Sequence, residues 1–144
     1  SKAEQAEMSL YRDDDMDIYQ PADHILGSMI KASPNFKLEG KKTFKDVVKA
    51  GVFIEPLKIK HVTQSYVEDW RSVVIPSTRG RVMKGRARMD QWELKFQLIC
   101  IDQRANERDM RDILQYAGSY CGIGDYRPRY GRFEVVSWDK VWKI

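Results

Sequence analysis

The chain has 144 residues, 42% of them hydrophobic and 32% charged, with a formal net charge of +4 at pH 7. This is the composition of one ordinary globular domain, which can bury a core without disulfide or metal staples. No apolar run approaches the roughly 20 residues of a membrane span, and the two cysteines lack metal-ligand spacing, so we expect a cytoplasmic protein with no membrane partner, no metal and no cofactor.

Residues 1–20 form a polar segment that we expect to be an N-terminal tail or linker. Its first half is compatible with a helix, and an acidic cluster follows. The cluster consists of Asp13, Asp14, Asp15 and Asp17. It lacks the glycine and the terminal glutamate of an EF-hand loop, so its composition favours solvated charge over a cation site. Residues 21–144 are predicted to form a single domain.

Two helices and a strand are predicted over the next forty or so positions. Residues 20–33 carry apolar side chains at helical spacing, and the Ser33-Pro34 pair ends that helix. Residues 43–51 begin with a capping-box pattern and continue as a short helix. The strand at 52–62 contains Pro56, which indicates an edge position or a bulge.

The middle of the chain is strongly basic. Residues 72–75 predict a short strand, 76–80 a turn and 81–89 an extended segment. Between positions 71 and 89 there are six basic residues and no acidic one. They are Arg71, Arg79, Arg81, Lys84, Arg86 and Arg88. A segregated positive field concentrates a polyanion better than evenly spread charge does; solvated strand faces are the structural alternative.

The last third of the chain predicts a strand, a helix, a loop and a final strand. Residues 92–101 alternate and then become apolar, which is typical of a strand that enters a covered sheet. Asn106 caps a helix that ends at Gly122, and residues 133–138 alternate again. The order of elements is most of a βαββαβ unit. We therefore expect an α+β protein with a ferredoxin-like antiparallel sheet and two main helices, whose first strand is short, missing or supplied from upstream; residues 16–20 offer a stub of it.

The loop at 122–133 combines three glycines, three arginines and three aromatic residues. Glycine lets a backbone approach a partner closely, while guanidinium planes and tyrosine rings hold phosphates and stack on unpaired bases. We expect this loop and the basic middle segment to meet in one trough that binds single-stranded nucleic acid. The predicted contact residues are Arg79, Arg81, Lys84, Arg86, Arg88, Tyr126, Arg127, Arg129, Tyr130 and Arg132. In the competing interpretation, the tyrosines pack against the sheet and the arginines pair with the acidic N-terminal segment.

Only His24 and His61 provide imidazole for acid–base chemistry near neutral pH. His24 stands at the start of the first predicted helix, where it could transfer a proton in metal-independent RNA cleavage while Arg79 or Arg127 stabilises the charge on the phosphorane. A lone histidine more often has a structural role, and serine-hydrolase, Walker and dinucleotide-binding signatures are absent. We therefore expect binding without catalysis.

Several stretches resemble a family of short proteins found in phages and prophages. They are residues 21–25, 40–42, 73–88, 92–96 and 116–133, of which the last is the most specific. More distantly, the chain is similar to the RAMP superfamily, whose members bind or process guide RNA in CRISPR effector complexes. There a glycine-rich basic loop follows the last helix, as residues 122–131 do here, and a Pro-Gly-Ser-Ser-x-Lys-Gly-like motif resembles residues 76–81.

The resemblance implies a phage-associated RNA-binding or single-stranded DNA-binding protein that acts in the host cytoplasm and forms homo-oligomers. Two other functions stay open. A phage protein could instead bind a host defence complex or another phage protein, and His24 could make the chain an endoribonuclease. The choice between RNA and DNA depends on contacts to the 2′-hydroxyl that a sequence does not reveal.

Overall fold

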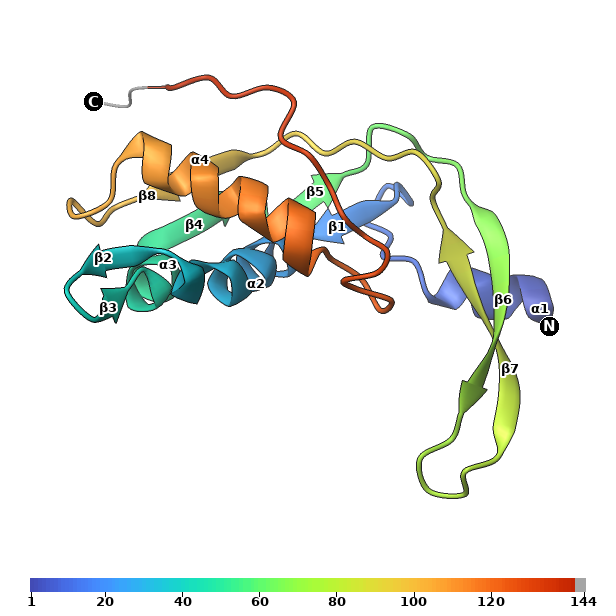
Figure 1. Cartoon of the computed structure of the whole chain (residues 1–144). Helices are drawn as coiled ribbons and strands as arrows, with labels where there is room; N and C mark the ends of the chain where they lie inside the picture. The colour runs from blue at the N-terminus through green and yellow to red at the C-terminus, as the bar shows by residue number, and fades with distance from the viewer. Residues whose placement is uncertain (142–144) are drawn as a thin grey trace. The chain divides into compact units, whose positions relative to one another are not determined.

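The computed structural model describes residues 1–141 and shows an α+β protein (Figure 1). The chain divides into two compact units. Unit 1 comprises Ser1–Pro21 and Lys58–Lys95, and unit 2 comprises Ala22–Leu57 together with the chain from Phe96 onward. Residues 1–20, expected to be a tail or linker, therefore fold together with the middle of the chain, and the remainder is shared between the two units.

Unit 1 combines one helix with two antiparallel strand pairs. Its elements are α1 (Lys2–Met8), β1 (Tyr19–Pro21), β5 (Lys58–Lys60), β6 (Val67–Val74) and β7 (Arg81–Arg88). β1 pairs with β5, and β6 pairs with β7 over their whole length. A short strand, β1, does form at the end of the stretch 16–20, but it pairs with β5 in unit 1 and does not join the pair of β4 (Val52–Glu55) and β8 (Gln97–Cys100) in unit 2, as the first strand of a ferredoxin-like sheet would. The basic segment forms a hairpin whose first strand begins five residues earlier than its alternation predicts, at Val67 instead of Ser72.

Helix α1 covers the outer edge of the β6–β7 hairpin. It begins with a capping box in which the Ser1 side chain accepts a hydrogen bond from the Glu4 amide and the Glu4 side chain accepts one from the N-terminus. The Gly85 amide of β7 donates to Gln5 Oε1 at 3.2 Å, and the Ala87 amide donates to Ser9 Oγ at 2.7 Å. These two bonds satisfy donors that an uncovered strand edge would leave exposed.

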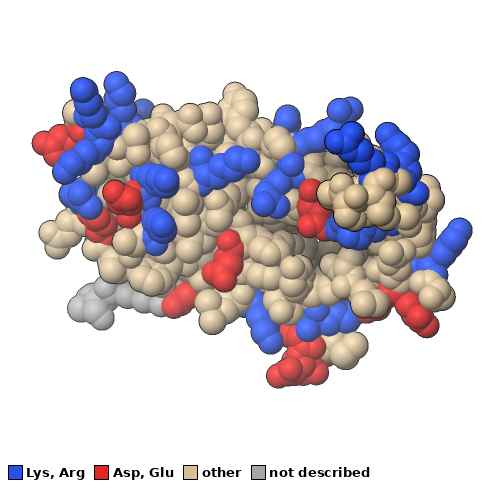
Figure 2. Space-filling model, turned by 90° about the horizontal axis from the view of Figure 1, so that it is seen from below, with Lys and Arg blue, Asp and Glu red and all other residues tan. Residues whose placement is uncertain are grey.

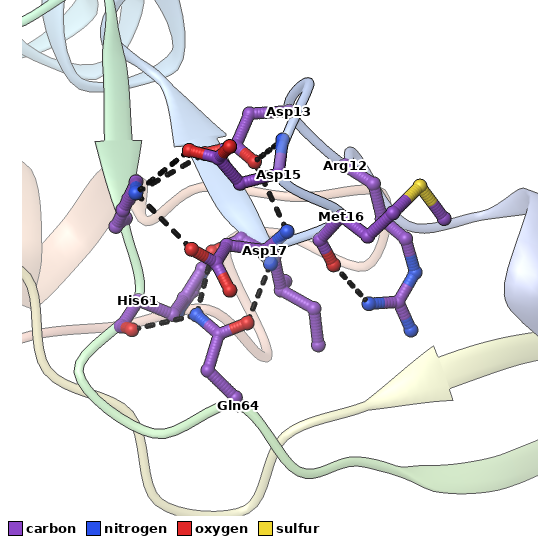
Figure 3. Close-up of polar contacts among 9 residues, drawn as sticks. Arg12, Asp13, Asp15, Met16, Asp17, His61 and Gln64 are labelled. Carbon is purple, nitrogen blue, oxygen red and sulfur yellow. Dashed lines mark hydrogen bonds and ion pairs between the residues drawn. The ribbon is translucent and has the colours of Figure 1, made fainter.

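The acidic cluster lies beside β5 and faces a lysine. Asp13, Asp15 and Asp17 point toward one another (Figure 3), and Lys60 Nζ lies 3.1 Å from a carboxylate oxygen of Asp17 and 3.7 Å from one of Asp13 and one of Asp15. The hydrogen bond to Asp17 and the neighbouring negative charges raise the pKa of Lys60. The Lys60 ammonium group therefore forms ion pairs with all three carboxylates, whose oxygens lie close enough together to be candidate ligands of a metal ion as well.

Unit 2 contains the other three α-helices of the described chain. Its elements are α2 (Ala22–Ala32), the 3₁₀ turn η1 (Ser33–Asn35), β2 (Lys37–Glu39), β3 (Lys42–Thr43), α3 (Lys45–Gly51), β4 (Val52–Glu55), β8 (Gln97–Cys100), α4 (Glu107–Tyr116) and the π-helical turn η2 (Ala117–Cys121). β4 pairs antiparallel with β8, from Val52 opposite Cys100 to Glu55 opposite Gln97. Helix α2 contacts β4, α3 and α4, so it lies at the centre of this unit.

The core of unit 2 follows the predicted apolar periodicities. The fully buried side chains include Ile25 and Met29 of α2, Val47 and Val48 of α3, and Ile113 of α4. Fully burying an aliphatic side chain of this kind stabilises the fold by about 1.5–3 kcal/mol. The helices that the sequence predicts at 20–33, 43–51 and 106–121 are therefore confirmed, with their ends within two residues of the expected positions for the first two.

The ends of α4 are fixed by local side chains. The Asp109 amide donates to Asn106 Oδ1 at 2.8 Å, and the Asn106 amide donates to Asp109 Oδ2 at 3.2 Å, which completes a capping box. At the other end the helix widens into η2 and stops at Gly122, whose φ is +67°. Glycine adopts this left-handed backbone without the steric cost that other residues have.

The final strand expected at 133–138 is wrong, because this segment pairs with no strand in the described chain. The Phe133 amide donates to the Gly118 carbonyl at 3.0 Å, and the Val135 amide donates to Gln115 Oε1 at 3.1 Å. The segment thus follows the α4–η2 helix, which takes up its amides. The predicted alternation of burial is present only over residues 133–136, where Phe133 and Val135 are half-buried and Glu134 and Val136 are exposed; it breaks at Ser137, which is exposed, and Trp138, which is half-buried.

The strand expected at 92–101 is shorter than predicted, since only Gln97–Cys100 belongs to a ladder. Residues 92–96 are extended but belong to no strand, and the chain passes from unit 1 to unit 2 within them, between Lys95 and Phe96. Each sheet in the described residues has two strands. In residues 1–141, no helix combines the length and the apolar character needed to cross a membrane.

Candidate nucleic-acid interface

The β6–β7 hairpin has two chemically different faces. Residues directly opposite in an antiparallel pair share a face, so Arg71, Lys84, Arg86 and Arg88 lie on the same face as Asp69. The other face carries Trp70, whose indole lies over Gly85: a Cβ on Gly85 would come within 2.6 Å of the ring. Lys2 of α1 places its ammonium 5.3 Å from the centre of the same indole. The predominantly basic face is therefore the one opposite the Trp70 side.

Acidic partners neutralise part of this basic face. Asp69 accepts from Arg71 at 2.6 Å and from Arg88 at 3.1 Å, and Arg88 also pairs with Asp90 at 2.7 Å. The hydrogen bond from Arg71, with that from Arg88, lowers the pKa of Asp69. The arginines of the hairpin base thus pair with acids of their own neighbourhood, whereas the competing interpretation assigned them to the N-terminal aspartates.

The far half of the hairpin keeps its positive charge. Arg79, Arg81 and Lys84 are exposed, and none of them forms an ion pair with any residue in the described part of the chain. Arg79 lies in the turn, where its φ is +56° and its amide donates to the Ile75 carbonyl at 2.7 Å. Val82 and Met83 lie between Arg81 and Lys84 in the sequence and are 44% and 59% exposed; Met83 shares the face of Arg81 and Trp70, and Val82 shares the face of Lys84. We call residues 79–84 the hairpin tip.

The Gly/Arg/Tyr loop of unit 2 is a closed structure. The Ile123 amide donates to the Gly131 carbonyl at 3.0 Å, and the Tyr130 amide donates to the Tyr126 carbonyl at 3.0 Å. Gly131 has φ +76°, and a Cβ there would lie 1.7 Å from the Ile123 carbonyl oxygen. The close backbone approach that the sequence predicts therefore occurs within the loop itself.

Two of the loop arginines brace the loop. The Arg127 guanidinium donates to the Gly124 carbonyl at 2.8 Å, and Arg132 Nε donates to the Pro128 carbonyl at 2.7 Å. Arg129 differs from them, because it is exposed and has no ion pair within residues 1–141. Among the three predicted loop arginines, Arg127 and Arg132 donate to loop carbonyls, whereas the charge of Arg129 is exposed to solvent.

The two loop tyrosines also have different environments. Their rings form an edge-to-face pair with centroids 6.5 Å apart. Tyr126 is half-buried and its hydroxyl oxygen is fully enclosed, whereas Tyr130 is 48% exposed. Tyr130 therefore presents the more exposed ring of the pair, and the half-buried Tyr126 packs against it.

His24 and Arg127 are brought together in unit 2. His24 is half-buried on α2, and its burial, followed by the positive charge of Arg127, lowers its pKa, an effect that the charge of Asp23 partly offsets. An imidazole with this pKa is neutral near pH 7. Arg79, the other predicted stabiliser of a phosphorane, belongs to unit 1.

His61 has a structural role in unit 1. It is 7% exposed, its Nε2 lies 3.2 Å from Gln20 Oε1, and Trp92 contacts its ring edge-to-face. Burial lowers the pKa of His61. Its carbonyl accepts a hydrogen bond from Gln64, which also brackets the backbone of Ile18 (Figure 3), so this group of residues holds β1 and β5 in place.

A third basic surface lies on unit 2 and was not among the predicted contacts. Figure 2 shows lysine and arginine side chains gathered on the part of unit 2 formed by β2, β3 and α3, at the left of the view. Its exposed lysines are Lys31, Lys37, Lys41, Lys42, Lys45 and Lys49, which we call the lysine face. Glu39 and Asp46 are the acidic residues between them. A count of charge over positions 31–49 would have identified it.

The structure therefore places the predicted contact residues on two units. Arg79, Arg81, Lys84, Arg86 and Arg88 belong to the hairpin of unit 1, whereas the loop residues belong to unit 2. Comparison of the chain with protein-family models, with curated proteins and with solved structures gave no match. The chemistry of each surface consequently carries the functional argument.

Proposed function

We propose that this protein binds single-stranded nucleic acid, without cleaving it, through the hairpin tip and the outward residues of the Gly/Arg/Tyr loop. The observation that supports this most is the unneutralised charge of Arg79, Arg81 and Lys84 at the far end of a two-stranded hairpin. Binding that tolerates any sequence needs cations that follow a phosphate backbone and flat or apolar groups that contact bases. The hairpin tip supplies both, because Val82 and Met83 are exposed between the cations.

The Gly/Arg/Tyr loop contributes an aromatic ring for base stacking and one further cation. Tyr130 presents an exposed ring, and Arg129 presents a free guanidinium next to it in sequence. Stacking of one base on an aromatic side chain stabilises a complex by about 1–3 kcal/mol. Closed by its own backbone hydrogen bonds, the loop loses little conformational entropy when it binds. The phage association and the homo-oligomer are parts of the same proposal, supported by the resemblance of residues 116–133.

A salt series with an unstructured fluorescent oligonucleotide tests the proposal by anisotropy. The logarithm of the association constant should fall linearly with the logarithm of salt concentration, by roughly 0.7 for each phosphate neutralised on a single strand. No binding at low salt would contradict the proposed function outright. Parallel titrations with RNA and DNA of the same sequence then measure the preference for the 2′-hydroxyl.

In the same assay, Arg129→Ala should reduce the salt slope by about 0.7, because one phosphate contact is lost. The thermal stability should not change, since the Arg129 side chain has no ion pair in residues 1–141. Arg132→Ala is the matched control: it removes an equal charge but also the bond to the Pro128 carbonyl, so it should lower the melting temperature. An isotherm of Arg129→Ala that equals the wild type would remove the loop from the binding surface.

His24 beside Arg127 favours a second candidate function, a metal-independent endoribonuclease. A neutral imidazole can accept the proton of a ribose 2′-hydroxyl, and a nearby guanidinium can stabilise the phosphorane. Labelled RNA incubated with protein and chelator should then be cleaved, and His24→Ala should remove the activity. Because the pKa of His24 is lowered, the rate should rise as the pH passes upward through that pKa and level off below pH 7. Uncut RNA would eliminate this candidate.

We also propose a ferredoxin-like relationship for the α+β fold. It is supported by the order α2, β4, β8, α4 in unit 2 and by the packing of α2 against both β4 and α4. Nuclear Overhauser effects in solution across the β4–β8 ladder and between α2 and α4 would support the relationship, and their absence would oppose it.

A further inference from the structure

The β6 edge of the β6–β7 hairpin has outward-pointing backbone amides without hydrogen bonds in residues 1–141. The direction of these amides follows from two hydrogen bonds made by β7. The amides of Gly85 and Ala87 point away from β6, because they donate to the side chains of α1. Trp70 is directly opposite Gly85 and Glu68 is directly opposite Ala87. In an antiparallel pair, two opposite residues either both bond to each other or both face outward. The amides of Glu68 and Trp70 therefore point away from β7.

The same parity applies along the whole of β6. Its outward amides belong to Glu68, Trp70, Ser72 and Val74. Within residues 1–141, none of these four amides forms a hydrogen bond. Gln5 of α1 and the C-cap residue Ser9 cover the part of the β7 edge that contains Gly85 and Ala87, while β6 presents an open edge of eight residues that reads Val-Glu-Asp-Trp-Arg-Ser-Val-Val. An edge of this length is a template for another strand.

We propose that β6 pairs antiparallel with β6 of a second copy of this chain, with Trp70 on the two-fold axis. Charge selects both the partner and the register. The outward amides of one β6 must be opposite outward amides of the other β6. Two registers meet this condition with the longest overlap, one centred on Trp70 and one on Arg71. Centring on Arg71 places that arginine opposite its own copy, which is unfavourable. Centring on Trp70 places Asp69 opposite Arg71 of the second copy on both sides of the axis, so the strand is complementary to itself.

The pairing would produce a four-stranded sheet in the order β7, β6, β6, β7. Residues that share a face of the hairpin also share a face of this sheet, so Arg71, Lys84, Arg86 and Arg88 from both copies would line one continuous surface. This pairing specifies the homo-oligomer that is part of the proposed function; it is argued from backbone geometry and charge and does not require that nucleic acid binds. If nucleic acid does bind, the dimer doubles the length of the basic face that a single strand can follow.

The register makes a specific prediction for residues 68 and 72, which become opposite neighbours across the axis. Ser72→Glu places a carboxylate opposite Glu68 of the other copy on each side of the axis and should weaken the dimer on the order of 10-fold. Glu68→Lys alone puts an ammonium opposite Ser72 and should leave the dimer intact. The double variant Glu68→Lys/Ser72→Glu should restore wild-type dimerisation, because within one strand these residues are too far apart to pair.

Sedimentation equilibrium of the full chain and its three variants measures these dissociation constants. The proposal is overturned if the wild type stays monomeric up to about 0.1 mM, if Ser72→Glu dimerises as the wild type does, or if the double variant fails to recover. Amide exchange of wild-type Trp70 and Ser72 gives an independent readout that needs no folded variant. Both amides should be protected at high protein concentration and lose protection on dilution, while the Val73 amide, which faces β7, stays protected throughout.

Discussion

Replacing Arg79, Arg81 and Lys84 together with alanine should lower the affinity for an unstructured oligonucleotide on the order of 10- to 100-fold at 0.15 M salt. The physical reason is the loss of three cations that have no ion pair elsewhere in residues 1–141. The salt slope should fall by about 2, from three phosphate contacts at roughly 0.7 each. The fold should be retained, since these side chains are exposed and the β6–β7 ladder is made by the backbone.

Lys41→Ala, Lys42→Ala and Lys45→Ala in one chain form the matched control. This triple variant removes the same charge, from the lysine face of unit 2. If the hairpin tip is the binding surface, the control should lose much less affinity than the hairpin variant. Equal losses would show that net charge and not the hairpin determines binding, and a larger loss in the control would transfer the site to the lysine face.

Gly131→Ala should destabilise the protein by roughly 2–5 kcal/mol and lower the melting temperature by roughly 5–15 °C. Its φ of +76° disfavours any side chain, and the added Cβ would lie 1.7 Å from the Ile123 carbonyl oxygen. The loop then cannot close through the hydrogen bond from the Ile123 amide to the Gly131 carbonyl. Thermal unfolding followed by circular dichroism measures this effect.

Gly124→Ala separates backbone strain from the steric clash. Gly124 also has a positive φ, +94°, but a Cβ there would meet nothing within 4 Å. We expect a loss of only about 1–2 kcal/mol from the unfavourable backbone conformation. Similar losses for both variants would mean that the loop opens easily and that its closed form is not required by the fold. Anisotropy with the same two variants then reports whether closure of the loop matters for binding.

The helices were predictable because their signals are local. The cap of α4 depends on Asn106 and Asp109, three residues apart, and its end depends on Gly122. The turn at 76–80 is likewise determined by neighbours in the chain. Residues 133–138 have the alternation of a strand, but a strand forms only where a partner strand, often distant in the sequence, is available to pair with it. Here the helix end at Gly118 takes the amide that a partner strand would have used.

The N-terminal segment shows the same limit. Its polar composition suggests a solvated tail. The neighbouring residues carry no signal that Gln5 and Ser9 accept hydrogen bonds from amides about eighty positions away. Once that contact is known, the buried Ala6 becomes intelligible as the point where α1 meets the hairpin.

Of the candidate site, the sequence revealed which residues are charged but not which charges are available. Asp69 stands 19 positions before Arg88 and neutralises it across the hairpin. Arg127 and Arg132 donate hydrogen bonds to the loop carbonyls of Gly124 and Pro128. Several of the predicted contact arginines therefore already have partners in the described chain, and the lysine face was overlooked because its residues are spread over two helices, two strands and the turns between them.

The covering of β7 by α1 limits how far such a sheet could grow. A hairpin with two open edges adds copies on both sides, and the result is a fibre. Gln5 and Ser9 occupy the outward amides of Gly85 and Ala87, whereas those of Arg81 and Met83 form no hydrogen bond within residues 1–141. The β7 edge therefore offers a neighbouring strand only its half near the hairpin turn, and the N-terminal helix disfavours strand addition on that side relative to the fully open edge of β6.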